Sequence, residues 1–278
     1  MRLRVIKKYY WIFLILLPAV SFSEVNPYSQ LNWIVGPTTQ TIDNRSTIFV
    51  PKNYVFLSVS ETDKYSKISQ NQPTGVEHFF APSDVSWESY FSFDEIGYVK
   101  DDEQLDADEL LELSREGDKA GNKYRKKQGW PTLTTVGWEF EPRYDSTNNL
   151  LEWAFIVQND DTKRKSINYN TRILGRNGVM NVVLVATPDV LHAAVSDFKV
   201  KVKGFKFNSG DKYSEYREGD RVAEFGLAAL IAGGAAALAS KKGFWATILS
   251  FLVASKNLVI AAVIGLFAWL VSLFRRKK

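Results

Sequence analysis

The stretch INYNTRILGRNGVMNVVLVA, residues 167–186, carries the strongest indication of the fold. Residues 167–174 alternate between apolar and polar side chains, which predicts a strand with one buried face. Asn177-Gly178 follows and is a strong hairpin signal, because both central residues of a tight two-residue turn adopt positive φ. Residues 179–186 are apolar on both faces, which predicts a central strand covered by a helix on at least one side. An antiparallel sheet is therefore expected at the centre of the fold.

Further strands are expected on both sides of this stretch. Residues 133–141 and 151–157 alternate, which places Trp138 and Trp153 on apolar faces as core residues. Other strands are predicted at residues 47–50, 54–59, 87–93, 96–99 and 199–207, the first two forming a hairpin.

Two helices are expected to flank these strands. Residues 106–128 carry Asp106 as a cap with Glu109 three residues later, and Gly129 marks the end. Gly117 and Gly121 weaken the middle of this helix. Residues 189–198 form the second predicted helix. The expected fold class is α+β: an antiparallel sheet flanked by helices, a sandwich, followed by carboxyl-terminal membrane helices.

Charge and composition exclude several classes of function. The net charge of +4 comes from the two ends, because residues 24–220 hold 23 Lys and Arg against 30 Asp and Glu. An acidic body argues against nucleic acid as a partner, since phosphate binding needs a clustered basic surface. The chain has no cysteine, which excludes disulfides, thiolate catalysis and Cys-based metal sites.

The amino end predicts export. Residues 1–23 combine a basic start, a short apolar run and small residues at Ser21 and Ser23, which is typical of a signal peptide cleaved after Ser23. An uncleaved anchor helix is the alternative. Residues 24–40 are polar and rich in turn formers, so we expect a lead-in of low order before an exported domain at 41–220.

The carboxyl end predicts a membrane anchor. Residues 257–274 carry no charge over eighteen positions, enough for a transmembrane helix. The basic residues 275–278 follow directly and mark a cytoplasmic end. The expected location is the bacterial cytoplasmic (inner) membrane, with the main domain in the periplasm.

Residues 221–256 are rich in small residues and precede this anchor. Ala229, Gly233 and Ala237 recur every four positions, a row that allows close helix packing and self-association. The segment is expected to lie at the membrane interface, to pack on the final span or a second copy, or to cross the membrane itself. Ordinary packing within one chain also uses such rows.

A polar face on the central strands is the candidate binding site. Glu139, Glu152, Asn168, Asn170 and Arg172 are expected opposite the apolar faces of their strands. The functional interpretation is a shallow site for a peptide or polar ligand, in which Arg172 binds a carboxylate through two hydrogen bonds. A solvated face with cross-strand ion pairs is the alternative.

The sequence carries no catalytic or cofactor motif. His78 and His192 lie in unrelated segments without metal-ligand spacing, and no phosphate-binding or nucleophile-elbow motif is present. We therefore predict no metal, no cofactor and no catalytic residue.

Several strings in the chain resemble a known family. NYNTRILGRNG at 168–178 and AEFGLAALIAGGAAALA at 223–239 are the most specific, with Gly137-Trp138, Tyr144-Asp145 and Trp153-Ala154 beside them. They are similar to bacterial membrane-anchored proteins grouped as a domain of unknown function. The resemblance implies an exported domain with a carboxyl-terminal membrane segment and brings no activity. The architecture also looks similar to exported sandwich modules of the PsbP type, which mostly bind partners.

Three functions follow as hypotheses. The first is a non-enzymatic module that binds a protein or peptide at the outer face of the cytoplasmic membrane. The second is an envelope hydrolase or transferase that uses carboxylates such as Glu139 and Glu141, which a deep pocket with a carboxylate of raised pKa would favour. The third is a membrane-assembly subunit that acts through its carboxyl-terminal helices.

Overall fold

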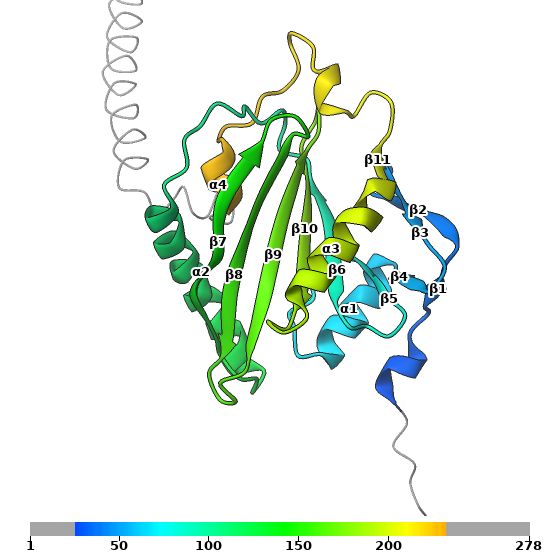
Figure 1. Ribbon diagram of the computed structural model, residues 1–278, viewed down its shortest axis with the longest axis vertical. Coiled ribbons are helices and arrows are strands. Elements are labelled where there is room, and N and C mark those ends of the chain that lie inside the picture. Colours follow the sequence, from blue (N-terminus) through cyan, green and yellow to red (C-terminus); the bar gives the residue numbers. More distant parts are fainter. Residues whose placement is uncertain (1–25, 232–278) are drawn as a thin grey trace, which may run out of the picture.

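An antiparallel sheet of eight strands forms the centre of the computed structural model, which describes residues 26–231 (Figure 1). Every pair of neighbouring strands is antiparallel. In spatial order the strands are β1 (Ile34–Val35), β4 (Tyr54–Leu57), β5 (His78–Pro82), β6 (Glu88–Asp94), β10 (Val179–Ala186), β9 (Lys165–Leu174), β8 (Leu150–Asn159) and β7 (Leu133–Asp145).

A second sheet of three strands lies against one face of the large sheet. Its strands in spatial order are β11 (Phe205–Phe207), β3 (Ser46–Val50) and β2 (Thr38–Ile42). Ile42 and Ile48 of this small sheet pack with Phe91 and Val182 of the large one. All four side chains are fully buried, so the two sheets share one core.

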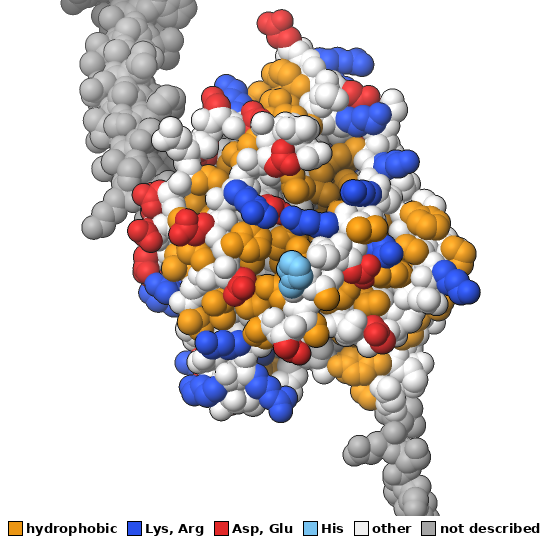
Figure 2. All heavy atoms as spheres, in the orientation of Figure 1, with side chains coloured by type: hydrophobic (Ala, Val, Ile, Leu, Met, Phe, Trp, Pro, Cys, Tyr) orange, Lys and Arg blue, Asp and Glu red, His pale blue; other side chains and the backbone are white. Residues whose placement is uncertain are grey.

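Helix α3 (Leu191–Lys201) covers the same face of the large sheet, in front of β10 in Figure 1. Its Ala194 and Phe198 are buried in the core shared with the small sheet. Figure 2 shows this side of the molecule, where basic, acidic and apolar side chains are interspersed.

The other face of the large sheet is covered at its two sides. Helix α1 (Val59–Ile68) and the 3₁₀ turn η1 (Pro27–Gln30) pack over β4 to β6, with Tyr65 against Phe79 and Tyr90. Helices α2 (Ala107–Lys127) and α4 (Leu227–Ile231) pack over β8, with Leu110 and Leu230 in a cluster around Trp153. The middle of this face lies between the two groups of helices.

The predicted α+β class and its antiparallel sheet are confirmed. Strands expected at 151–157, 167–174 and 179–186 appear as β8, β9 and β10, with β10 in the interior of the sheet. Helix α2 begins after Asp106, whose side chain accepts a hydrogen bond from Glu109 N, and continues unbroken through Gly117 and Gly121. Gly129, at φ +71°, follows its end.

One expected strand pairing and one expected strand are wrong. Residues 46–50 and 54–57 do not form a hairpin, because β3 pairs with β2 and β11 while β4 pairs with β1 and β5. The turn between them carries the chain from one sheet to the other. Residues 96–99 form no strand; Tyr98 makes a single bridge to Val222.

The strand expected at 199–207 is mostly helical. Helix α3 continues to Lys201 and the 3₁₀ turn η2 (Val202–Gly204) follows, so only β11 is extended. Ala194, Phe198 and Val202 recur every four residues and pack into the same core, a helical spacing that outweighs the local alternation.

The lead-in expected at 24–40 contributes structure. Its residues supply η1, β1 and part of β2. At the other end, α4 and a short 3₁₀ turn, η3 (Tyr213–Glu215), complete the elements of residues 26–231. The predicted signal segment and transmembrane helix, residues 1–23 and 257–274, lie outside the described residues.

Candidate functional site

A groove crosses the part of the large sheet that α1, α2 and α4 leave open. It consists of three adjoining cavities of about 410, 660 and 290 Å³ that share lining residues. Its floor comes from β6, β10, β9 and β8. One wall is the end of α1 with the connection to β5, and the other is α2 with α4 at one end.

The register of the strands places the floor side chains in three rows. Because alternate residues of a strand point to the same face, residues paired across neighbouring strands share a row. The rows are Glu88, Val185, Asn168 and Phe155; Tyr90, Val183, Asn170 and Trp153; and Ser92, Asn181, Arg172 and Leu151.

Arg172 is the cation on this floor. Its guanidinium lies 4.7 Å from the ring centroid of Trp153, and its Nη1 donates a hydrogen bond of 3.2 Å to the Thr171 carbonyl. Among residues 26–231 no carboxylate lies within 4.0 Å of it. Burial lowers the pKa of Arg172 to about 10, against the opposing charge of Asp94. The protein therefore holds an enclosed positive charge beside a cavity without pairing it.

Two carboxyl groups lie on the other side of the groove. Glu88 Oε2 accepts a hydrogen bond of 2.5 Å from the Tyr65 hydroxyl. Glu77 lines the same cavity as Glu88 and also the cavity that Arg172 lines. Burial raises the pKa of both Glu77 and Glu88, since the charged form loses hydration. Burial, with the charge of Glu88, also raises the pKa of Tyr90, whose hydroxyl is buried without a well-formed hydrogen bond.

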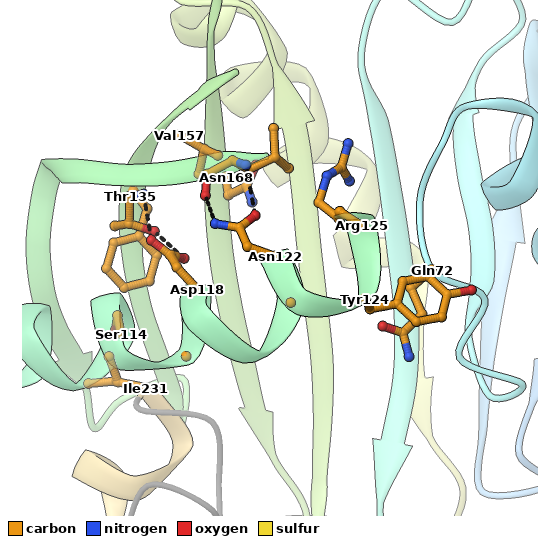
Figure 3. A pocket seen from close by; sticks show the side chains of 14 residues that line it. Gln72, Ser114, Asp118, Asn122, Tyr124, Arg125, Thr135, Val157, Asn168 and Ile231 are labelled. Atoms are coloured by element: carbon orange, nitrogen blue, oxygen red, sulfur yellow. Dashed lines mark hydrogen bonds between the residues drawn. The ribbon is translucent and has the colours of Figure 1, made fainter. Parts of the chain in front are cut away.

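Arg125 joins the two walls of the groove. It lies near the end of α2, and its Nη1 donates a hydrogen bond of 3.0 Å to the carbonyl of Gln70, just beyond α1. Figure 3 shows Arg125 and Tyr124 at the same end of α2, near Gln72. Arg164 and Lys165 line the groove near this end, so both charge signs are present along it.

Helix α2 also closes the free edge of the sheet. Asp118 accepts hydrogen bonds from the backbone N and the hydroxyl of Thr135, at 2.7 and 3.0 Å. Asn122 pairs with both the backbone N and O of Leu133 (Figure 3), and Arg115 donates to the carbonyls of Thr135 and Val136. These side chains occupy the backbone groups that a further strand would pair with.

A family model described as "Protein of unknown function (DUF2167)" matches residues 34–267. The chain belongs to the DUF2167 family. No curated protein matches it in sequence.

Two solved structures share a general similarity with this DUF2167 chain. One is the solution structure of cyanobacterial PsbP (CyanoP) from Synechocystis, at 13% identity and a TM-score of 0.37, covering 63% of this chain and 95% of that one. The other is the Ran-binding protein Mog1p from Saccharomyces cerevisiae, at 9% identity and a TM-score of 0.32, covering 66% of this chain and 100% of that one.

The structure brings together three of the five residues predicted for a binding site. Asn168, Asn170 and Arg172 lie on the groove side of β9, and Asn168 and Arg172 line its cavities. Asn170 is buried in the middle row and donates a hydrogen bond to the Asn168 carbonyl.

The expectation that Glu152 shares this face is wrong, and Glu139 is not among the residues that line the groove. Glu152 pairs with Thr171 rather than Arg172, so it points to the opposite face, where it contacts Tyr169, Lys199 and Arg143. Glu139 is exposed on β7, at a register shift between Trp138 and Phe140. Bulges of this kind change the face to which the following side chains point.

Sequence reasoning missed the acidic side of the groove. Glu88, Tyr90, Ser92 and Asp94 alternate with Ser89, Phe91 and Phe93 along β6. This polar alternation was available in the sequence. What the sequence did not provide was the order of strands, which places β6 two positions from β9 with β10 between them.

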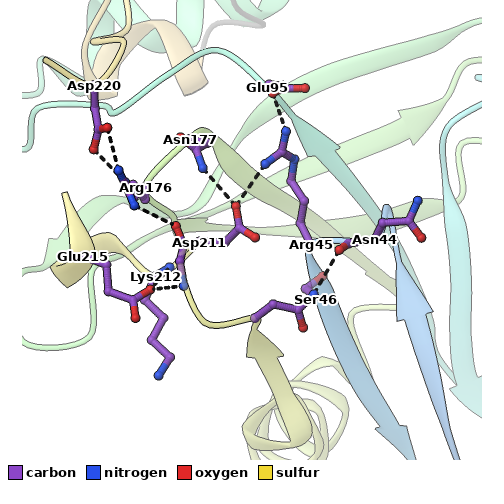
Figure 4. Close-up of polar contacts among 12 residues, drawn as sticks. Asn44, Arg45, Ser46, Glu95, Arg176, Asn177, Asp211, Lys212, Glu215 and Asp220 are labelled. Carbon is purple, nitrogen blue, oxygen red and sulfur yellow. Dashed lines mark hydrogen bonds and ion pairs between the residues drawn. The ribbon is translucent and has the colours of Figure 1, made fainter. Parts of the chain in front are cut away.

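The second half of the NYNTRILGRNG string (168–178) has a structural role. Arg176 forms two hydrogen bonds of 2.7 Å with Asp220, and Asn177 donates one of 3.0 Å to Asp211 (Figure 4). Arg45 contacts the same Asp211 carboxylate and also Glu95. These contacts hold the loop between β11 and α4 against the turn that connects β9 and β10.

The remaining predicted residues lie away from the groove or outside the structure. His78 stacks on Phe56, and His192 lies on α3, both on the opposite face of the sheet. Ala229 is buried in α4, while Gly233 and Ala237 lie outside the described residues, so their role in helix packing stays a prediction.

Residues 26–231 hold no cluster of three or more His, Asp or Glu arranged for a metal. In the same part of the chain, every helix is too short or too polar to cross a membrane.

Proposed function

We propose that this DUF2167 protein is a non-enzymatic binding module whose groove takes a short, extended peptide. The observation that supports this function is Arg172, an enclosed cation that lines a cavity without a carboxylate within ion-pair distance in the described residues. Arginine suits this role because its planar guanidinium can bind a carboxylate through two parallel hydrogen bonds.

The floor of the groove suits a peptide backbone. Amide side chains of Asn168 and Asn181 line it and can both donate and accept hydrogen bonds, as a peptide backbone requires. Four strands at about 4.8 Å spacing give a floor about 14 Å wide, the length of four extended residues. Val183 and Val185 add apolar surface between the amides.

We propose further that the groove faces the envelope, with the domain exported and tethered to the outer face of the cytoplasmic membrane. The apolar segment 257–274 and the basic residues 275–278 support this placement. Protease treatment of spheroplasts that carry a tag after Lys278 tests it: digestion of the body with a protected tag is expected. A protected body would contradict export.

The binding function is tested by affinity selection on the full-length protein in detergent. A pool of random pentapeptides is incubated with wild type, Arg172→Met and Glu139→Gln, and retained peptides are quantified by mass spectrometry. We expect wild type and Glu139→Gln to retain the same peptides and Arg172→Met to lose them, because Glu139 is exposed outside the groove. Equal retention by wild type and Arg172→Met would contradict the proposal.

A carboxylate-dependent hydrolase or transferase is the second candidate, favoured by Glu88. Its carboxyl lines the largest cavity of the groove beside Tyr65, and its raised pKa suits a general acid. Incubation of the same peptide pool tests this candidate. New masses that form with wild type and not with Glu88→Gln would favour catalysis, while an unchanged pool favours binding.

A further inference from the structure

On its floor, the groove holds a guanidinium and a carboxyl group at separate places, Arg172 on β9 and Glu88 on β6, and neither has an ion-pair partner within 4.0 Å in the described residues. We infer that its ligand is zwitterionic, with a free amino group at Glu88 and a free carboxylate at Arg172. This inference rests on the proposed peptide-binding function and names the chemistry that the groove selects.

The acidic place is formed by Glu88, with Tyr90 two residues further along β6. Glu77, on the wall, lines both this cavity and the one that Arg172 lines. Glu88 has the Tyr65 hydroxyl as a hydrogen-bond donor, at 2.5 Å. No Lys or Arg of residues 26–231 lies within 4.0 Å of the Glu88 carboxyl group; Arg125, Arg164 and Lys165 line the same cavity beyond that distance. A ligand ammonium group would supply the missing positive charge and up to three donors.

The basic place is formed by Arg172. One Nη donates to a backbone carbonyl and the flat face stacks on Trp153, which leaves further guanidinium N–H groups for a ligand. Asn181 and Ser92, its neighbours in the same row, line the same cavity. Asp94 also lines this cavity but is exposed, and it lies beyond ion-pair distance.

The separation of the two places sets the length of the ligand. Glu88 lies in the first row on β6 and Arg172 in the third row on β9, two strands across and four residues along. Strand spacing and rise give about 17 Å between their Cα atoms. An extended peptide rises about 3.4 Å per residue, so about five residues join the two places. The diagonal crosses Val183 in the middle row.

The experiment uses the full-length protein in detergent and one pool of random pentapeptides in four forms. The forms have free ends, an acetylated amino end, an amidated carboxyl end, or both ends blocked. Retained peptides are quantified by mass spectrometry on wild type, Glu88→Gln, Arg172→Met and the exposed control Glu139→Gln.

We expect each block to lower retention on wild type by about tenfold, the loss of one charge-assisted hydrogen-bonding contact. Glu88→Gln should no longer distinguish acetylated from free amino ends, and Arg172→Met should no longer distinguish amidated from free carboxyl ends. Glu139→Gln should behave as wild type.

The outcomes separate this inference from the proposed function. Equal retention of all four forms on wild type overturns the zwitterionic ligand and leaves peptide binding in place. No retention of any form overturns both. The comparison of peptide forms on wild type needs no variant, so it decides the inference even if a substitution prevents folding.

Discussion

The guanidinium of Arg172 lies over the indole of Trp153, 4.7 Å from the ring centroid, on the floor of the groove. Trp153 is fully buried and fixes the position of the cation from below. Stacking on an indole stabilises an arginine without satisfying its N–H groups, which stay available in the plane of the guanidinium. The pair thus holds a positive charge ready for an anionic group.

Replacement of Arg172 should affect binding far more than stability. An enclosed charge without a partner costs desolvation free energy, so Arg172→Met should leave the free energy of unfolding within about 1 kcal/mol of wild type or raise it. Urea denaturation of the full-length protein measures this difference. A loss of several kcal/mol would mean that Arg172 serves the fold instead.

Glu88 should make the protein less stable as the pH rises. Its pKa is raised in the folded state, so the folded protein holds the proton more tightly than the unfolded chain. Its contribution to stability is present below its ordinary pKa of 4.5 and is lost as the pH rises from there to the raised value. Denaturation of wild type and Glu88→Gln between pH 4 and 8 should therefore show a stability difference that grows with pH in favour of the variant. Parallel pH profiles would refute this assignment.

Glu152 should be a stability residue on the opposite face. It accepts a hydrogen bond of 2.5 Å from Tyr169 and pairs with Lys199 at 3.0 Å. Burial opposes its charge, but these contacts outweigh burial and lower its pKa, so its contribution is present above its ordinary pKa of 4.5 and is lost as the pH falls below it.

We expect Glu152→Ala to cost about 2 kcal/mol near neutral pH, less than a fully enclosed ion pair because Lys199 reaches solvent. Glu139→Ala, at an exposed position, is the matched control and should stay within about 0.5 kcal/mol. Equal effects of the two substitutions would show that the Glu152 contacts contribute nothing.

The contacts of α2 with β7 should protect the edge of the sheet. Asp118→Ala removes the acceptor for the Thr135 N–H, so amide hydrogen exchange at Thr135 should accelerate, with a cost of about 1.5 kcal/mol. Glu116→Ala, on the exposed side of the same helix, should leave exchange at Thr135 unchanged. Unchanged exchange in Asp118→Ala would contradict the edge-capping role.

Gly178 should be intolerant of any side chain. A Cβ at this position would lie 2.0 Å from the backbone oxygen of Asp94, at the end of β6. Gly178→Ala must therefore push two neighbouring strands apart, and we expect a loss of about 3 kcal/mol or more in urea denaturation. Gly137→Ala is the control, because a Cβ at position 137 would have no heavy atom within 4 Å. Gly210→Ala is not suitable, because Gly210 has a positive φ.

The sequence predicted the interior strands best. Strands β8 and β9 pair from Leu150 to Gln158 without a register shift, so alternate side chains of each strand keep to one face, as the sequence pattern predicts. Asn177-Gly178 correctly marked the hairpin, but its turn spans residues 175–178 and neither residue has positive φ. The glycine is needed for its close approach to Asp94 and not for its backbone angles.

The sequence predicted the β9 side of the candidate site and missed its acidic side on β6. Alternation along β9 correctly places Asn168, Asn170 and Arg172 on one face. Alternation within β8 does not show which of its two faces lies beside the polar face of β9. The observed register places Trp153 beside Asn170, so Glu152 points to the opposite face. The acidic half needed the order of strands, which depends on contacts between distant residues.

The most direct test of the groove as a peptide site is photo-cross-linking from its floor. A benzophenone amino acid replaces Val183, in the middle row, in the full-length protein, and pooled free-ended pentapeptides are added before irradiation. A matched protein carries the same group at Val200, which is exposed on α3. We expect peptide adducts at position 183 that disappear in an Arg172→Met background, and none above background at position 200. Equal labelling at both positions, or labelling at 183 that does not depend on Arg172, would contradict the proposed peptide site.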